Sequence, residues 1–226
     1  MGERQMLETR DVLGNLPAIV RNEDGLYEGN IVPYFRAVFF HARNLRNPYH
    51  NFRHLCHVLW LCYQACLFYN DRLPKRQVRA LLIAALFHDF DHIGSKVADE
   101  ENIRRAVEGI TLHIQPEDRE ELPNIIALIR ASEYPYKVPT ESLGLRAQIL
   151  RDADMAQVFS VAWVQQTVFG LSAEWGKPPL EILKTEANFL RSLKFHTEWA
   201  KSFFTPATIE AKIVEINALN AILSEA

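Results

Sequence analysis

The sequence has few of the features that mark secreted, membrane-spanning or duplex-binding proteins. Only 3 of its 226 residues are cysteine, and the longest apolar run, residues 80–87, is too short to cross a bilayer. The N-terminal residues, Met-Gly-Glu-Arg-Gln-Met, lack the apolar core of a signal peptide. The 25 basic residues do not outnumber the 28 acidic ones, whereas a duplex-binding protein needs a basic surface for the phosphates. We therefore expect a cytoplasmic protein that binds neither membranes nor duplex nucleic acid.

Strand patterns and glycine are scarce as well, and apolar residues recur mostly at steps of three and four. This periodicity predicts one all-α domain over residues 1–226, a multi-helix bundle of about eight to ten helices. The expected helices are 52–69, 78–88, 100–113, 117–132, 142–172 with a bend near 152–154, 180–204 and 206–223. The helix over 78–88 is apolar on most faces, which indicates a central, buried position.

Histidine is the residue type that stands out. Five of the 8 histidines lie within residues 50–92, in two short segments and one helix: His50, His54, His57, His88 and His92. Positions four apart share a helix face, so we expect His50 and His54 to face one cavity, and His92 to follow His88 if that helix continues. Two further segments carry carboxylates, Ser132-Glu133 and Arg151-Asp152-Ala153-Asp154.

The chemistry of these side chains favours a metal site. Charged groups at the end of a buried helix are costly unless they are paired or bind a metal. Imidazole together with carboxylate suits first-row divalent cations, and a carboxylate such as Asp89 can bridge two ions. Two such ions can hold a hydroxide and clamp a phosphate, while a further histidine protonates the leaving oxygen. The ordered set of histidines and aspartates therefore predicts metal-assisted hydrolysis of a phosphate ester.

Simpler explanations cover the remaining candidates. A lone histidine on an apolar face is more often a core residue than a ligand, which is our interpretation of His57. Cys62 and Cys66 lie one turn apart but have no further sulfur nearby, and they are expected to be core residues. Asp152 and Asp154 point about 200° apart on a helix, so only one of them can face a metal.

The motifs resemble those of the HD-domain superfamily of metal-dependent phosphohydrolases, and within it most nearly the class I cyclic nucleotide phosphodiesterases. The resemblance lies in three segments: Tyr49-His50-Asn51-Phe52-Arg53-His54, Phe87-His88-Asp89-Phe90-Asp91-His92-Ile93-Gly94 and Arg151-Asp152-Ala153-Asp154. It covers about residues 34 to 200. The resemblance implies an enzyme with one or two divalent metal ions, of which Mn, Fe, Mg, Co, Ni and Zn all accept such ligands.

The resemblance also implies roles for individual residues. The first metal would be held by His54, His88, Asp89 and Asp154. Asp89 would also reach the second ion, and His50 would donate a proton to the leaving oxygen. The family position favours Asp154 over Asp152. Three supporting residues would surround the ligands: His92 near the second metal, Asn51 at the loop that carries His50, and Glu133 near the water molecules of the second metal.

The likeness is weaker where the family recognises its substrate. The chain is shorter than those catalytic domains, and the glutamine and phenylalanine that clamp the purine have no match; Gln157, Gln165 and Gln166 fall too early. A small phosphate ester, such as a nucleotide or cyclic nucleotide, is the expected substrate. The alternatives are a nucleotidase, a phosphomonoesterase for a signalling nucleotide, and a catalytically silent regulatory HD module. The amphipathic stretch 186–204 offers a face for a homodimer.

Overall fold

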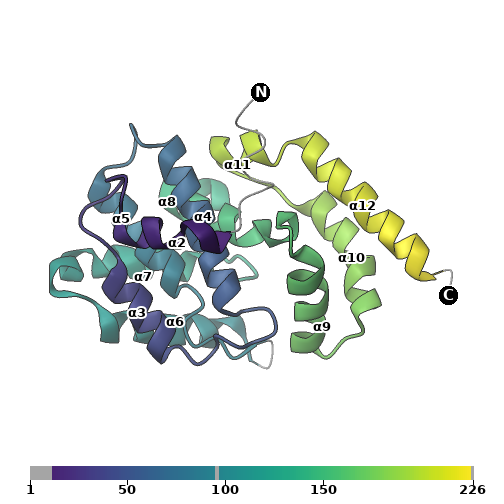
Figure 1. The fold of residues 1–226 in the computed structure, drawn as a ribbon, viewed down its shortest axis with the longest axis horizontal. Coiled ribbons are helices and arrows are strands. Elements are labelled where there is room, and N and C mark those ends of the chain that lie inside the picture. The colour runs from purple at the N-terminus through teal and green to yellow at the C-terminus, as the bar shows by residue number, and fades with distance from the viewer. Residues whose placement is uncertain (1–11, 95–96, 225–226) are drawn as a thin grey trace.

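The computed structural model describes residues 12–94 and 97–224, and it confirms the expected all-α class (Figure 1). Helix accounts for 71% of the chain, and the described residues contain no strand. The α-helices are α2 (Val12–Arg21), α3 (Val32–His41), α4 (Phe52–Phe68), α5 (Lys75–Phe87), α6 (Asp99–His113), α7 (Leu122–Ala131), α8 (Leu145–Asp154), α9 (Gly170–Trp175), α10 (Pro179–Ser192), α11 (Glu198–Phe203) and α12 (Pro206–Ser224). The charged N-terminal residues lie outside the described part of the chain.

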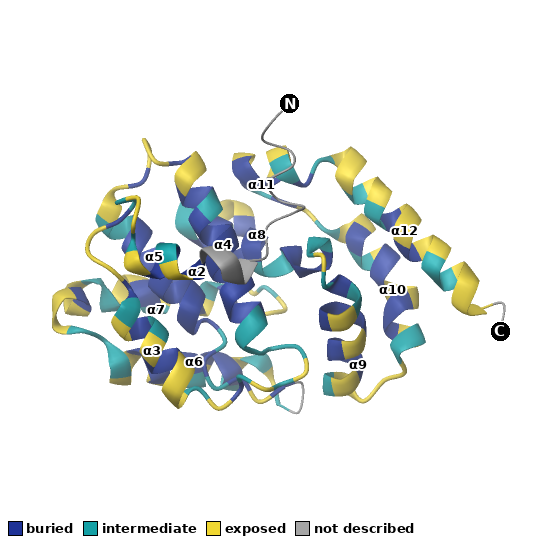
Figure 2. Ribbon diagram, viewed as in Figure 1, coloured by how far each residue is buried: buried dark blue, intermediate teal, exposed yellow. Residues whose placement is uncertain are grey.

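Helices α4 and α5 pack against each other at the centre of the main hydrophobic core (Figure 2). Every residue of α5 from Val78 to Phe87 is buried, as the apolar character of this stretch predicts. Helix α4 is buried over most of its length as well. The two helices thereby hold the histidines at their ends, His54 and His88, inside the protein.

One charged residue of α5, Arg79, is buried with its own partners. Its guanidinium donates two hydrogen bonds of 2.7 Å to the carboxylate of Asp118, and the hydroxyl of Tyr34 donates a third of 2.7 Å. Two backbone carbonyls accept from the same guanidinium. A buried charge is tolerated only when it is paired and hydrogen-bonded, and the Arg79–Asp118 pair meets this condition. Together with Tyr34, the pair links α3, α5 and the 3-10 helix η2 (Pro116–Glu121).

The structure corrects two of the expected helices, because each of them is interrupted. The stretch 142–172 begins with a 3-10 turn, η3 (Thr140–Ser142), and α8 is followed by the 3-10 helix η4 (Met155–Phe159) and the π-helix η5 (Val164–Phe169) before α9 begins. The stretch 180–204 is divided into α10 and α11. The second break is occupied by Asp152, whose carboxylate accepts from the backbone of His196 and Thr197 and from the Thr197 hydroxyl at 2.7–3.1 Å.

A smaller hydrophobic cluster lies under the C-terminal helices. It contains Trp163 and Val168 near η5, Leu190 on α10 and Ile216 on α12, with Phe159 packed against both this cluster and the main core. Helix α12 extends along the outer edge of this region (Figure 1). None of the described helices combines the length and the apolar character that a bilayer span requires. Helix α9 packs against η5 and α10, which both contribute residues to this cluster.

Candidate metal centre

His54 lies in the first turn of α4, and the cap of that helix holds it in place. Asn51 is the N-cap residue, and its Oδ1 accepts from the backbone N–H groups of Arg53 at 2.9 Å and His54 at 3.1 Å. His50 therefore precedes the helix, and the expectation that His50 and His54 share a helix face is wrong. The residues before the asparagine form turns and bends, so His50 approaches the site from a loop.

His88 and Asp89 occupy the end of α5. The helix stops at Phe87, with His88 as its C-cap, so His92 does not continue the helix as expected. The Nδ1 atom of His88 is 2.9 Å from the carbonyl oxygen of Ala85, and a proton on Nδ1 donates to it. This bond leaves Nε2 unprotonated when the ring is neutral, which is the arrangement found in metal-binding histidines. His54 is oriented in the same way by a contact of 3.4 Å between its Nδ1 and Oε1 of Gln157.

Four side chains converge where these elements meet. The Nε2 atoms of His54 and His88 are 3.4 Å apart, and Oδ2 of Asp89 lies 3.2 Å from each of them. Oδ1 of Asp154, at the end of α8, lies 3.1 Å from Nε2 of His54 and 3.6 Å from Nε2 of His88. Both imidazoles are only 1% exposed. The structure thus brings together all four residues expected to hold the first metal.

The separations of these donor atoms fit a bound cation. The three distances among His54, His88 and Asp89 average about 3.3 Å, and the centre of such a triangle lies about 1.9 Å from each corner. Metal–ligand bonds to imidazole and carboxylate measure about 2.0–2.2 Å, so a small cation just outside this plane contacts all three atoms. Oδ2 of Asp89 is also buried without a hydrogen-bond partner among the described residues. A bound cation would satisfy the lone pairs of this buried carboxylate oxygen.

The charges of the cluster are balanced by the same contacts. Burial lowers the pKa of His54, but the neighbouring carboxylates of Asp154 and Asp89 outweigh it and raise that pKa to about 9. The pKa of His88 is also raised well above its usual value, against burial, chiefly by Asp89. The net charge of two imidazolium groups and two carboxylates is zero. The net charge of two neutral imidazoles, two carboxylates and one divalent cation is zero as well. A divalent ion can therefore replace two protons without leaving a net buried charge.

Of the two aspartates at the end of α8, Asp154 faces the cluster. Asp152 instead points toward the start of α11, where both of its oxygens accept hydrogen bonds from His196 or Thr197. The two residues lie two positions apart on one helix, so they cannot face the same way. The geometry agrees with the family position, and Asp152 instead holds the segment that leads into α11.

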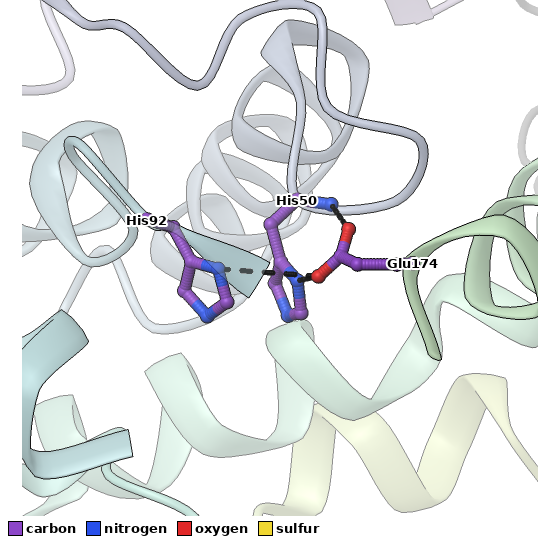
Figure 3. A group of neighbouring side chains, drawn as sticks. All are labelled: His50, His92 and Glu174. Atoms are coloured by element: carbon purple, nitrogen blue, oxygen red, sulfur yellow. Dashed lines mark hydrogen bonds and ion pairs between the residues drawn. The ribbon is translucent and has the colours of Figure 1, made fainter. Parts of the chain in front are cut away.

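A second group of side chains lies beside the cluster and contains a residue that the sequence did not reveal. His50, His92 and Glu174 come from three different parts of the chain and meet as Figure 3 shows. Glu174 on α9 forms a short hydrogen bond with Nδ1 of His50, and its other oxygen accepts from the backbone N–H groups of Tyr49 at 3.1 Å and His50 at 3.2 Å. The rings of His50 and His92 stack with their centroids 3.6 Å apart. Glu174 therefore fixes both the loop and the ring orientation of His50.

The remaining expected residues have other contacts. His92 Nδ1 accepts from the backbone N–H of Gly94 at 3.0 Å and lies 4.0 Å from Glu174, so His92 belongs to the second group. Glu133 forms an ion pair of 2.6 Å with Lys137, and its contacts among the described residues do not include the four converging side chains. Gln166, on η5, donates to the carbonyl oxygen of Tyr49 and to Oδ1 of Asn51. It supports the His50 loop, a role that no sequence motif indicated.

Comparison with known proteins adds no further identification. No family model matches the chain, and no curated protein matches it. The structure by itself supports an all-helical fold with two buried groups of histidine and carboxylate side chains that could hold metal ions.

Proposed function

We propose that this protein is a metal-dependent hydrolase of phosphate esters, related in mechanism to the phosphodiesterases of the HD-domain superfamily. The observation that carries the proposal is the convergence of His54, His88, Asp89 and Asp154 at 3.1–3.6 Å, next to a histidine held by its own carboxylate. A purely structural metal site has no need of His50, the histidine that Glu174 holds. The resemblance of the motifs, described above, supports the same reaction class.

The four converging residues would hold the metal. When bound, a divalent cation supplies Lewis acidity toward a phosphoryl oxygen and lowers the pKa of water. Asp89 and Asp154 provide the negative charge that retains the cation. The hydrogen bonds of His54 and His88 through Nδ1 keep their Nε2 atoms directed at it.

His50 is the proposed proton donor to the leaving oxygen. Its Nδ1 is hydrogen-bonded to Glu174, which leaves Nε2 for the substrate. The His50 side chain is 21% exposed, whereas Glu174 is only 4% exposed. A buried carboxylate behind a partly exposed imidazole holds the ring in one orientation, as general acid catalysis requires.

The proposal is tested by assaying hydrolysis and metal content together. Protein purified without chelator is analysed for Mn, Fe, Mg, Co, Ni and Zn and assayed on bis-p-nitrophenyl phosphate and a panel of cyclic nucleotides and nucleoside monophosphates. We expect turnover that is lost on chelation and restored by one of these ions. Release of inorganic phosphate would identify a monoesterase, and its absence a cyclic diesterase.

Variants of the ligands give the sharper test. Asp89→Asn keeps the shape of the side chain but removes the charge and should reduce both metal content and kcat by at least a hundredfold. His41→Gln is the matched control, because His41 is an exposed histidine on α3 outside the cluster. Full activity in Asp89→Asn, or metal-loaded wild-type protein without turnover on any phosphate ester, would contradict the proposed function.

A further inference from the structure

A separate cavity lies beside the C-terminal part of α8, and Arg151, Asp152 and Met155 are among the residues that line it. Its volume is about 200 Å³, room for a phosphate group with several water molecules. Aromatic side chains form part of its wall, among them Tyr136 and Phe189, and the polar groups around it include Arg151 and Lys194. The contacts made by these two cations determine what the cavity can bind.

Arg151 is a buried cation that has no anionic partner among the described residues. The residue is only 4% exposed, and its Nε and Nη1 donate to the carbonyl oxygens of Ala131 and Val138 and to the hydroxyl of Thr140 at 2.5–2.8 Å. The guanidinium carbon lies 3.8 Å from the centroid of the Tyr136 ring. No described carboxylate pairs with Arg151, and its Nη2 has no acceptor among the described residues. Arg79 is also buried, but it is paired with Asp118.

The other charged groups at the cavity leave it with a surplus of positive charge. Asp152 lies beside Arg151, but its oxygens accept from backbone N–H groups and the Thr197 hydroxyl. His196 lies 3.6 Å from the exposed carboxylate of Glu141. Lys194 is exposed and has no ion-pair partner among the described residues. With Arg151 and Lys194 against Asp152, the cavity attracts an anion, and the fixed fork of an arginine suits phosphate oxygens.

The cavity also adjoins the candidate metal centre. Arg151 precedes Asp154 by three residues on α8, and side chains at that spacing are neighbours on a helix surface. Met155, which lines the cavity, follows Asp154 directly. The cavity and the four converging side chains are therefore served by adjoining positions of the same helix.

We propose that the cavity of Arg151, Tyr136 and Lys194 is a phosphate-binding subsite. Its occupant is either a second phosphate group of the substrate or a free phosphate-bearing effector, since both present the same chemistry. Only the first source rests on the proposed function. The subsite would give the protein a preference for phosphate esters that carry an additional phosphate group.

The first experiment measures binding of inorganic phosphate, by calorimetry, to protein treated with chelator. Chelation removes metal-dependent binding at the cluster, so the measurement does not require catalytic activity. We expect Arg151→Lys to weaken phosphate binding about tenfold and Lys194→Met about threefold. Lys184→Met, which removes an exposed lysine of α10 outside the cavity, is the matched control and should bind as the wild type does. Lys194→Met removes only an exposed side chain, so it remains informative even if Arg151→Lys fails to fold.

The second experiment identifies the source of the phosphate. If the substrate supplies it, Arg151→Lys should lose about ten times more kcat/KM on a nucleoside 3′,5′-bisphosphate than on bis-p-nitrophenyl phosphate. If an effector supplies it, added phosphate should change the wild-type rate on bis-p-nitrophenyl phosphate and affect Lys194→Met less. Absence of phosphate binding to the wild type, or equal affinity in all four proteins, would overturn the subsite. Absence of hydrolysis alone would overturn only the proposed function.

Discussion

Asp154→Asn and Asp152→Asn form a matched pair of substitutions, because the two aspartates share one helix but have different partners. Asp154 lies 3.1 Å from Nε2 of His54, whereas Asp152 accepts hydrogen bonds at the start of α11. Each substitution removes one carboxylate charge and leaves the side-chain volume nearly unchanged. The first should abolish the effect of a metal ion on stability, and the second should lower stability with or without metal.

The size of both effects follows from general energetics. A metal ion at 100 times its Kd stabilises the folded state by about 2.7 kcal/mol, which for a chain of this length raises Tm by about 5–10 °C. Asp154→Asn should lose most of this increase, because an amide oxygen is a much weaker ligand than a carboxylate. Asp152→Asn should weaken charge-assisted hydrogen bonds, cost about 2 kcal/mol, and lower Tm by about 4–8 °C.

The assay is thermal unfolding of chelator-treated protein, monitored by circular dichroism, before and after titration with Mn²⁺ or Zn²⁺. We expect the wild type and Asp152→Asn to show the same metal-dependent rise from different starting values. Asp154→Asn should show almost no rise. The reverse outcome, in which Asp152→Asn alone loses the response to metal, would refute the assignment of Asp154 as the ligand.

Three further predictions concern other buried groups. Glu174→Gln should lower kcat by about tenfold to a hundredfold with little change in KM, because His50 loses the carboxylate that orients it; an unchanged steady-state kcat would exclude that role. Asp118→Asn should destabilise the protein by about 3 kcal/mol in urea unfolding at pH 7, because Arg79 is left buried and unpaired. In the wild type, the contacts of Asp118 with Arg79 and Tyr34 outweigh burial and lower the pKa of its carboxyl group. The stability that the ionised carboxylate contributes is therefore present above the pKa of Asp118 in the unfolded chain. The difference in unfolding free energy between wild type and variant should shrink as pH falls through the lowered pKa of the folded protein. Burial raises the pKa of Glu186 from 4.5 to about 7. The stability that the protonated side chain contributes is therefore present below pH 4.5 and lost as pH rises through 7. Glu186→Gln should stabilise the protein against urea by about 2 kcal/mol at pH 8 and have no stabilising effect at pH 4.

Local patterns in the sequence accounted for the elements that carry the ligands. The periodicity of residues 52–69 and 78–88 corresponds closely to α4 and α5, because both helices bury their apolar residues against each other. The helix expected over 142–172 ends its first α-helical part at Asp154, where the bend near 152–154 was expected, and the helix expected over 180–204 is divided for a reason that is not local. The carboxylate of Asp152 binds the backbone at residues 196–197, and periodicity contains no information about such a contact.

The sequence by itself determined the all-helical class and the residue types of the candidate site, because helix periodicity and the short His and Asp motifs are both local properties. Only the tertiary structure decided how those residues are used. It chose Asp154 over Asp152 and brought Glu174 to His50 across 124 positions of the chain. Such choices depend on how α8 packs against α4 and α5 and on how α9 meets the loop that carries His50. That packing minimises exposed apolar surface over the whole molecule, and no single segment of the sequence specifies it.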